Sequence, residues 1–232
     1  MKRMAAMLAG MMLMLGIGTT AQALTLTVTS GTESKTITDG QVGDMSGING
    51  KISFMDMLVG NYLVTVESAQ GFSHPYASWP QALHLSAVFT SSTLGGSLTF
   101  TLTDSGLSLP NLRTDLSPNA LVKYGIGGSI KVGDQITNTI TYSTDGTSTQ
   151  QLPELSLINS GMSFHAEDSA LIDLVNPFTL SEVVTIDFGR NRGTSSFDAG
   201  VDIIPTPEPA TMVLFGAGLL SLAIYCKRRK NV

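Results

Sequence analysis

The residues that decide the fold are LTLTVT at positions 24–29, where every second residue is apolar and the others are threonines. Residues 98–103 read LTFTLT, and residues 136–142 place three apolar side chains and Asn138 on one face. Because successive side chains of a strand point to opposite faces, this alternation predicts strands with one face on a core and one in water. Threonine is β-branched and suits the solvated face.

Turn residues divide the rest of the chain into more short strands. Gly60 and Asn61 separate the apolar runs 52–59 and 62–66, which predicts a two-residue hairpin of the II′ kind. Further turns are marked by the dipeptides Asp39-Gly40, Gly95-Gly96 and Asp145-Gly146.

Two late strands are predicted at residues 183–188 and 194–204. The best helical candidate, residues 167–175, is short and equally compatible with a strand. The sequence therefore predicts an all-β domain over residues 24–204, an antiparallel β-sandwich of the jelly-roll or immunoglobulin-like kind.

Charge and cysteine content limit the partners of this domain. Residues 24–205 contain 7 Lys and Arg against 17 Asp and Glu, a net charge of −10. Such a domain does not bind nucleic acid or anionic lipid through bulk electrostatics, so cations or neutral sugars are expected instead. The single cysteine, Cys226, lies outside it, so its core must hold it together without a disulfide.

The N-terminus has the three regions of a secretory signal peptide in order. A positive pair at residues 2–3 precedes an apolar and glycine run at 4–17, and Ala21 and Ala23 form an A-x-A-like cleavage site. The alternative is a buried N-terminal helix. We expect residues 1–23 to be removed and the mature chain to begin at Leu24.

The C-terminus, residues 205–232, is a three-part tail. Residues 205–209 read PTPEP, a stiff extended segment, and residues 210–226 carry no charge. As a helix the uncharged run would span roughly 25 Å, slightly less than a bilayer core of about 30 Å. The chain then ends on a basic cluster of Lys227, Arg228, Arg229 and Lys230. This pattern predicts a transmembrane helix with its basic end in the cytoplasm.

Pro207-Glu208-Pro209, one apolar helix and a terminal arginine cluster resemble the PEP-CTERM sorting signal of Gram-negative bacteria. The resemblance implies processing by an exosortase, a membrane-embedded cysteine transpeptidase that cuts near the motif. It makes the Pro-Glu-Pro triplet the recognition site and Arg228 and Arg229 the residues that hold the tail in place. The family is associated with exopolysaccharide production and biofilm or floc formation.

Other interpretations of the tail are a permanent single-pass anchor, a Gram-positive sorting signal and a lipid-anchor signal. The near match to Leu-Pro-x-Thr-Gly at residues 152–156 lies far from the tail, and a lipid-anchor signal ends in apolar residues rather than cations. The body also loosely resembles a group of PEP-CTERM proteins over residues 39–104, 176–180 and 196–199. That resemblance supports the sandwich and implies no chemistry.

Candidate binding residues in the body are few. Tyr76 and Trp79 could stack on a sugar ring, although Trp79 could equally fill the core. His74 and His84 have a spacing that matches no common metal site. Loop aspartates could bind calcium weakly; they are Asp39, Asp44, Asp104 and Asp145.

Catalytic motifs are also lacking in the sequence. His165, Glu167 and Asp168 are close in sequence, which is not a catalytic geometry, and a solvated loop is the simpler interpretation. There is no G-x-S-x-G, calcium loop, G-x-G-x-x-G or P-loop. We therefore predict neither an enzyme nor a bound metal or cofactor.

Three functions fit these observations, and we rank them by how well the sequence supports each. The first is an exported, exosortase-sorted protein of the cell surface or exopolysaccharide matrix with a structural or interaction role, transiently anchored in the inner membrane. The second is a carbohydrate-binding module that uses Tyr76 and Trp79. The third is a glycan hydrolase, which needs two carboxyl groups about 5–10 Å apart.

Overall fold

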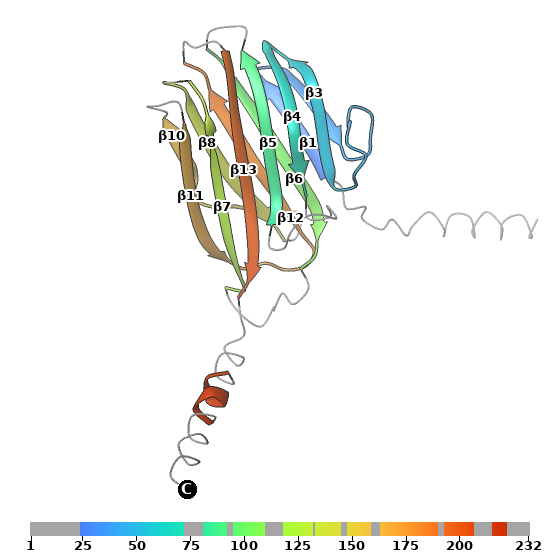
Figure 1. Cartoon of the computed structure of the whole chain (residues 1–232). Coiled ribbons are helices and arrows are strands. Elements are labelled where there is room, and N and C mark those ends of the chain that lie inside the picture. Colours follow the sequence, from blue (N-terminus) through green and yellow to red (C-terminus); the bar gives the residue numbers. More distant parts are fainter. Residues whose placement is uncertain are drawn as a thin grey trace, which may run out of the picture.

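The computed structural model shows two antiparallel β-sheets packed face to face (Figure 1). It describes residues 24–71, 81–91, 95–109, 118–131, 133–144, 148–158, 163–189, 193–206 and 215–221. The strands are β1 (Leu24–Ser30), β2 (Glu33–Thr38), β3 (Lys51–Val59), β4 (Tyr62–Gln70), β5 (Gln81–Ser91), β6 (Ser97–Leu107), β7 (Ala120–Ser129), β8 (Gln135–Ser143), β9 (Thr149–Gln151), β10 (Leu155–Ile158), β11 (Phe164–Ile172), β12 (Phe178–Asp187) and β13 (Gly193–Pro205).

The strand order is that of a jelly roll, which decides between the two predicted kinds of sandwich. We call the sheet β10-β8-β12-β6-β1-β2 sheet A and the sheet β11-β7-β13-β5-β4-β3 sheet B. From β5 onward the chain alternates between them, apart from β9 and β10, which both pair with β8. The spatial orders β5-β13-β7-β11 and β6-β12-β8-β10 form the eight-stranded roll, and the β1-β2 and β3-β4 hairpins extend it.

The period-two pattern correctly predicted β1, β6 and β8. In β1 and β6 the leucines and other apolar residues point inward, while the threonines face the partly exposed side. The Gly60-Asn61 turn joins β3 and β4 as predicted, with Gly60 at a φ of +58°. A II′ turn has a positive φ at its first central residue, here Gly60, and a negative φ at its second, here Asn61. Asn61 meets this requirement, because Asp56 is the one non-glycine residue with positive φ in the described part. Residues 167–175 begin within β11 and are not helical.

Aromatic rings fill the centre of the sandwich. Phe89 of β5 and Phe197 of β13 come from sheet B, and Phe100 of β6 comes from sheet A. Phe100 and Phe197 meet edge to face with ring centroids 5.1 Å apart, and Phe89 packs in the same way on Phe188 at 5.6 Å. Such pairs stabilise the core beyond simple area burial, by about 0.5–1.5 kcal/mol each.

One carboxylic acid lies inside this core. Glu182 of β12 is completely buried, and its Oε1 accepts a hydrogen bond of 3.0 Å from Nδ2 of Asn138, which is also completely buried. Burial raises the pKa of Glu182 to about 8, opposed by the Asn138 hydrogen bond and aided by the charge of Asp198. The face predicted for Asn138 is confirmed, but its partner Glu182 was not predicted.

Candidate functional site

Most sequence-predicted site residues lie outside the described residues. These are the cleavage residues Ala21 and Ala23, the sugar-contact candidates Tyr76 and Trp79, the candidate His74, the sorting triplet Pro207, Glu208 and Pro209, and the basic cluster Lys227, Arg228, Arg229 and Lys230. Their roles remain predictions, and so do the limits of the signal peptide and of the tail. The candidate site formed by the described residues lies elsewhere, on the outer face of sheet B.

Three glycines lie side by side on that face. Gly125 and Gly127 occupy outward positions of β7, and Gly200 occupies an outward position of β13. The strand register sets Gly200 opposite Gly125, and Asp198 opposite Gly127. Because a glycine has no side chain, the peptide backbone itself is the surface here. We call these three glycines the trough floor.

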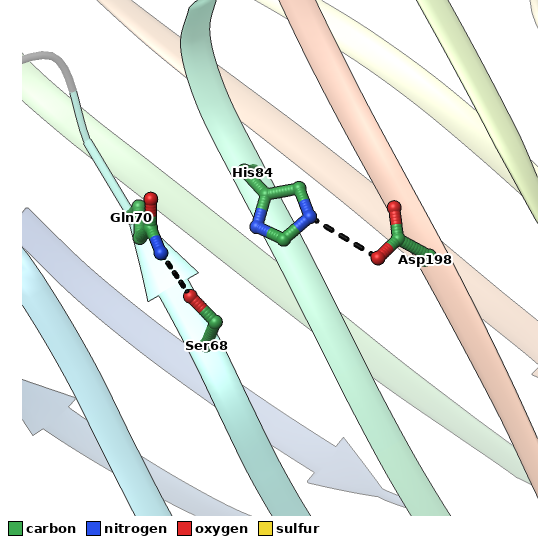
Figure 2. A network of polar contacts seen from close by, with 4 residues as sticks. All are labelled: Ser68, Gln70, His84 and Asp198. Atoms are coloured by element: carbon green, nitrogen blue, oxygen red, sulfur yellow. Dashed lines mark hydrogen bonds and ion pairs between the residues drawn. The ribbon is translucent and has the colours of Figure 1, made fainter. Parts of the chain in front are cut away.

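Polar side chains stand on both sides of the floor. On one side His84 of β5 lies opposite Gly200, and its Nε2 is 3.1 Å from Oδ2 of Asp198. Figure 2 shows the two side chains pointing toward one another from neighbouring strands, with Ser68 and Gln70 of β4 beside them. Gln70 Nε2 donates to the Ser68 hydroxyl, which continues the polar surface away from the floor.

The other side of the floor is formed by edge strand β11. His165 lies opposite Gly127 and Glu167 opposite Gly125, and His165 Nε2 is 3.0 Å from Oε1 of Glu167. An added Cβ on Gly125 would stand 3.1 Å from Cγ of Glu167, and one on Gly127 would stand 3.2 Å from Nδ1 of His165. Both side chains therefore lean over the glycines.

Two adjoining hollows of about 510 and 420 Å³ occupy this face and share Gly125, Glu167, Gly200 and Asp202 in their walls. Asp202 of β13 lies opposite Lys123 of β7. Burial raises the pKa of Asp202, and the charge of Lys123 opposes that rise. We call the whole depression the glycine trough; its floor is Gly125, Gly127 and Gly200, and its walls are His84, Lys123, His165, Glu167, Asp198 and Asp202.

A tyrosine supports the β11 side of the trough from within. The Tyr124 hydroxyl donates to the carbonyl oxygen of Pro153 at 2.7 Å and lies 3.4 Å from Oδ2 of Asp168. Burial, followed by the Asp168 charge and hydrogen bond, raises the pKa of Tyr124 to about 12. The hydroxyl thus keeps its proton and remains a donor at any physiological pH.

The loop predicted at His165, Glu167 and Asp168 is wrong, although their side chains are exposed as predicted. These residues belong to β11, where alternation puts His165 and Glu167 on the outer face and pairs Asp168 with Tyr124. The run HAED carries no apolar residue except alanine, so its own pattern did not predict a strand, although residues 167–175 were compatible with one. Pairing with the strongly patterned β7 makes it one.

Two of the four candidate calcium ligands, Asp39 and Asp44, accept hydrogen bonds from backbone amides. Asp104 is not a loop residue but lies buried in β6, and Asp145 lies outside the described residues. Asp44 Oδ1 accepts from the amides of Ser46 at 2.8 Å and Ser53 at 3.1 Å, and its Oδ2 accepts from Gly40 at 3.0 Å. Asp39 Oδ2 accepts from the amide of Gly50 at 2.7 Å. Among the described residues no group of three or more His, Cys, Asp or Glu side chains is arranged to hold a metal ion.

The sandwich ends where the predicted tail begins. The last strand, β13, runs to Pro205, and the Thr206 amide then donates to the Asn119 carbonyl oxygen at 2.9 Å. The Thr206 hydroxyl donates to the Pro118 carbonyl oxygen at 3.3 Å. Residues 215–221 form a short α-helix, and no helix within the described residues has the length and apolar character needed to cross a membrane.

Sequence reasoning missed the glycine trough, although its signal is present. The segments YGIGG at 124–128 and DAGVD at 198–202 keep the period-two pattern of a strand but place glycine where a solvated threonine would be expected. In a strand, such glycines often mark a place where something approaches the backbone closely.

Solved structures with a similar arrangement of strands include carbohydrate-binding modules. A module from the β-sandwich superfamily is 13% identical over 78% of this chain and 73% of its own, with a TM-score of 0.37. TmCBM61, solved with β-1,4-galactotriose, is 11% identical over 63% and 90%, with a TM-score of 0.33. At these identities and TM-scores the likeness concerns the sandwich arrangement alone.

The enzymatically active domain of tailspike protein 4 from bacteriophage CBA120 is also similar. It is 12% identical over 72% of this chain, with a TM-score of 0.37, and this chain spans 20% of it. No curated protein matches the chain in sequence.

The C-terminal segment does match a family. Residues 205–230 fit the family described as the PEP-CTERM protein-sorting motif. The match begins at Pro205, the last residue of β13, and includes the Pro-Glu-Pro triplet, the uncharged run and the basic cluster. The chain thus carries a PEP-CTERM protein-sorting motif, directly after its β-sandwich.

Proposed function

We propose that this chain is exported, sorted by an exosortase through its C-terminal motif, and active outside the inner membrane at the cell surface or in the extracellular matrix. Its role there is a non-catalytic, structural or interaction role, in association with exopolysaccharide. The inner membrane holds the chain only until the tail is processed.

The observation that carries this proposal is the direct junction between the sandwich and the sorting motif. β13 ends at Pro205, Thr206 is still hydrogen-bonded to the base of the sandwich, and the motif match covers residues 205–230. A cut beside the Pro-Glu-Pro triplet would therefore free a complete sandwich without breaking a strand. The net charge of −10 over residues 24–205 further favours partners other than nucleic acid.

The test is the intact mass of the mature protein recovered from its native host. We expect a mass that begins at Leu24 and ends near Pro209. A mass that continues to Val232 would mean a permanent single-pass anchor and would end the exosortase proposal.

A matched variant separates specific processing from general proteolysis. Replacing Pro207, Glu208 and Pro209 together by alanine removes the triplet and leaves every strand unchanged. We expect this variant to keep its tail and to stay in the membrane fraction. Trimming at the same position as in the wild-type protein would show that the triplet is not what the processing enzyme recognises.

A further inference from the structure

The glycine trough on the outer face of sheet B is, we propose, a binding site for a glycan that carries free amino groups. The inference rests on the trough and not on how the protein is sorted, so each can fail without the other. It also does not involve Tyr76 or Trp79, which lie outside the described residues.

The floor of the trough indicates that a ligand approaches the backbone. Gly125, Gly127 and Gly200 lie in β7 and β13, two central strands of the sheet. Each glycine inside a strand weakens it by roughly 0.5–1 kcal/mol relative to alanine. None of the three has a left-handed φ, so the backbone conformation does not require glycine at any of them. Gly125 and Gly127 admit the side chains of Glu167 and His165. Gly200 lies between His84 and Gly125 in the strand register and lines both hollows.

The walls supply the groups that recognise hydroxyls. His84 with Asp198 and His165 with Glu167 form two imidazole–carboxylate pairs on opposite sides of the floor. Three of these four side chains are largely exposed, at 66% for Asp198, 67% for His165 and 73% for Glu167. A carboxylate has about four acceptor positions, so each retains the capacity to accept from a ligand. Paired hydrogen bonds of this kind suit neighbouring sugar hydroxyls.

The charge of the walls favours a cationic sugar over a neutral or acidic one. The described lining of the two hollows contains four carboxylates, those of Glu167, Asp168, Asp198 and Asp202. Lys123, opposite Asp202, contributes the only ammonium among these lining residues. The excess of negative charge attracts ammonium groups, and a charge-assisted hydrogen bond is roughly twice as strong as a neutral one. An acidic glycan would be repelled.

The shape and polarity of the trough favour a glycan over a protein partner. Protein interfaces need apolar anchors in desolvated pockets. The two large apolar or aromatic residues in the trough lining, Tyr124 and Ile126, are only 3% and 2% exposed. The trough extends from β5 to β11 across β13 and β7, roughly 14 Å at the usual strand spacing. A short saccharide chain can lie along that length.

The test is calorimetric titration of the full chain, kept in mild detergent, with a tetramer of β-1,4-linked glucosamine. The fully N-acetylated tetramer is the comparison, because acetylation removes the positive charge and keeps the ring. We expect the glucosamine tetramer to bind and acetylation to weaken binding at least tenfold. Absence of binding, equal binding of both tetramers, or recovery of shortened chains would each overturn the proposal of an amine-selective binding site.

Two variants locate the binding. Gly200→Thr places a side chain that strands favour on the floor, so we expect at least tenfold weaker binding, with the melting temperature measured to show that the variant folds. Asp198→Asn removes one wall charge and should weaken binding about fivefold, which keeps the test decisive if Gly200→Thr fails to fold. Asp187→Asn removes a charge on the exposed side of β12 in sheet A and should bind like the wild type. Wild-type affinity in Asp198→Asn would place the ligand elsewhere and overturn the proposal.

Discussion

At the scale of single residues, the buried pair of Glu182 and Asn138 is expected to make the stability of the protein depend on pH. Glu182 Oε2 and Asn138 Oδ1 are both buried without a hydrogen-bond partner, while the other two polar atoms of the pair bond each other. A protonated Glu182 provides the donor that the amide oxygen lacks. The carboxylic acid is therefore the form that fits this core.

Stability is accordingly expected to fall as the pH rises. The folded pKa of about 8 exceeds the ordinary value of 4.5, so the folded protein holds a proton that the unfolded chain releases. The stabilisation is complete below pH 4.5 and is lost as the pH rises through 8, by at most about 5 kcal/mol. Glu182→Gln should remove this pH dependence and be more stable than the wild type at pH 9. Urea denaturation of both proteins at pH 5, 7 and 9 measures the free energy of unfolding. The same change with pH in the wild type and in Glu182→Gln would contradict this prediction.

Asn119 is a second residue whose effect is local and testable. Its side chain donates to the Leu174 carbonyl oxygen at 2.7 Å and accepts from the Leu174 amide at 2.9 Å, fixing the segment between β11 and β12. Asn119→Ala leaves both Leu174 groups without that partner, so we expect a loss of about 2–4 kcal/mol in the free energy of unfolding. Asn49→Ala, at an exposed position, is the control and should change it by less than about 0.5 kcal/mol. Equal losses in the two variants would rule out this role.

At the scale of elements, the β3-β4 hairpin depends on the conformation of Gly60. Its φ is +58°, and an added Cβ would lie 2.9 Å from the Ser30 hydroxyl oxygen. Gly40 has a φ of +68° but open space, and Gly47 has open space and no left-handed φ. Thermal unfolding should therefore rank the alanine variants: Gly47→Ala near wild type, Gly40→Ala weaker by about 1 kcal/mol, and Gly60→Ala weakest. If Gly60→Ala were not the least stable of the three variants, the β3-β4 turn would tolerate a side chain at this position.

The same scale shows how far the sequence predicts the molecule. Strands such as β1 and β6 were predictable because their alternation is strict, and the hairpin was predictable because its turn residues are specific. β11 was not, because its strand character comes from pairing with β7 rather than from its own pattern. The trough was also missed, since it joins residues as distant as His84 and Asp198, and their proximity depends on strand order and register.

At the scale of the whole molecule, the sandwich should be stable without its tail. Thr206 is the last residue before the sorting triplet and still bonds to the sandwich base. Removing residues 207–232 should leave the melting temperature unchanged. Removing residues 203–232 also takes the fully buried Ile203 and the end of β13, and should cost about 3 kcal/mol or more. Calorimetry of the two truncated proteins checks this; a large loss in the shorter truncation would show that the tail supports the fold.

The position of β13 also has a mechanical consequence. It pairs along its length with β5 on one side and β7 on the other, it carries Asp198, Gly200 and Asp202, and it leads into the tail (Figure 1). While the tail is attached, tension between a ligand held in the trough and the membrane would run along this single strand. The load would shear two ladders of hydrogen bonds at once instead of peeling an edge strand, which is the arrangement that resists rupture.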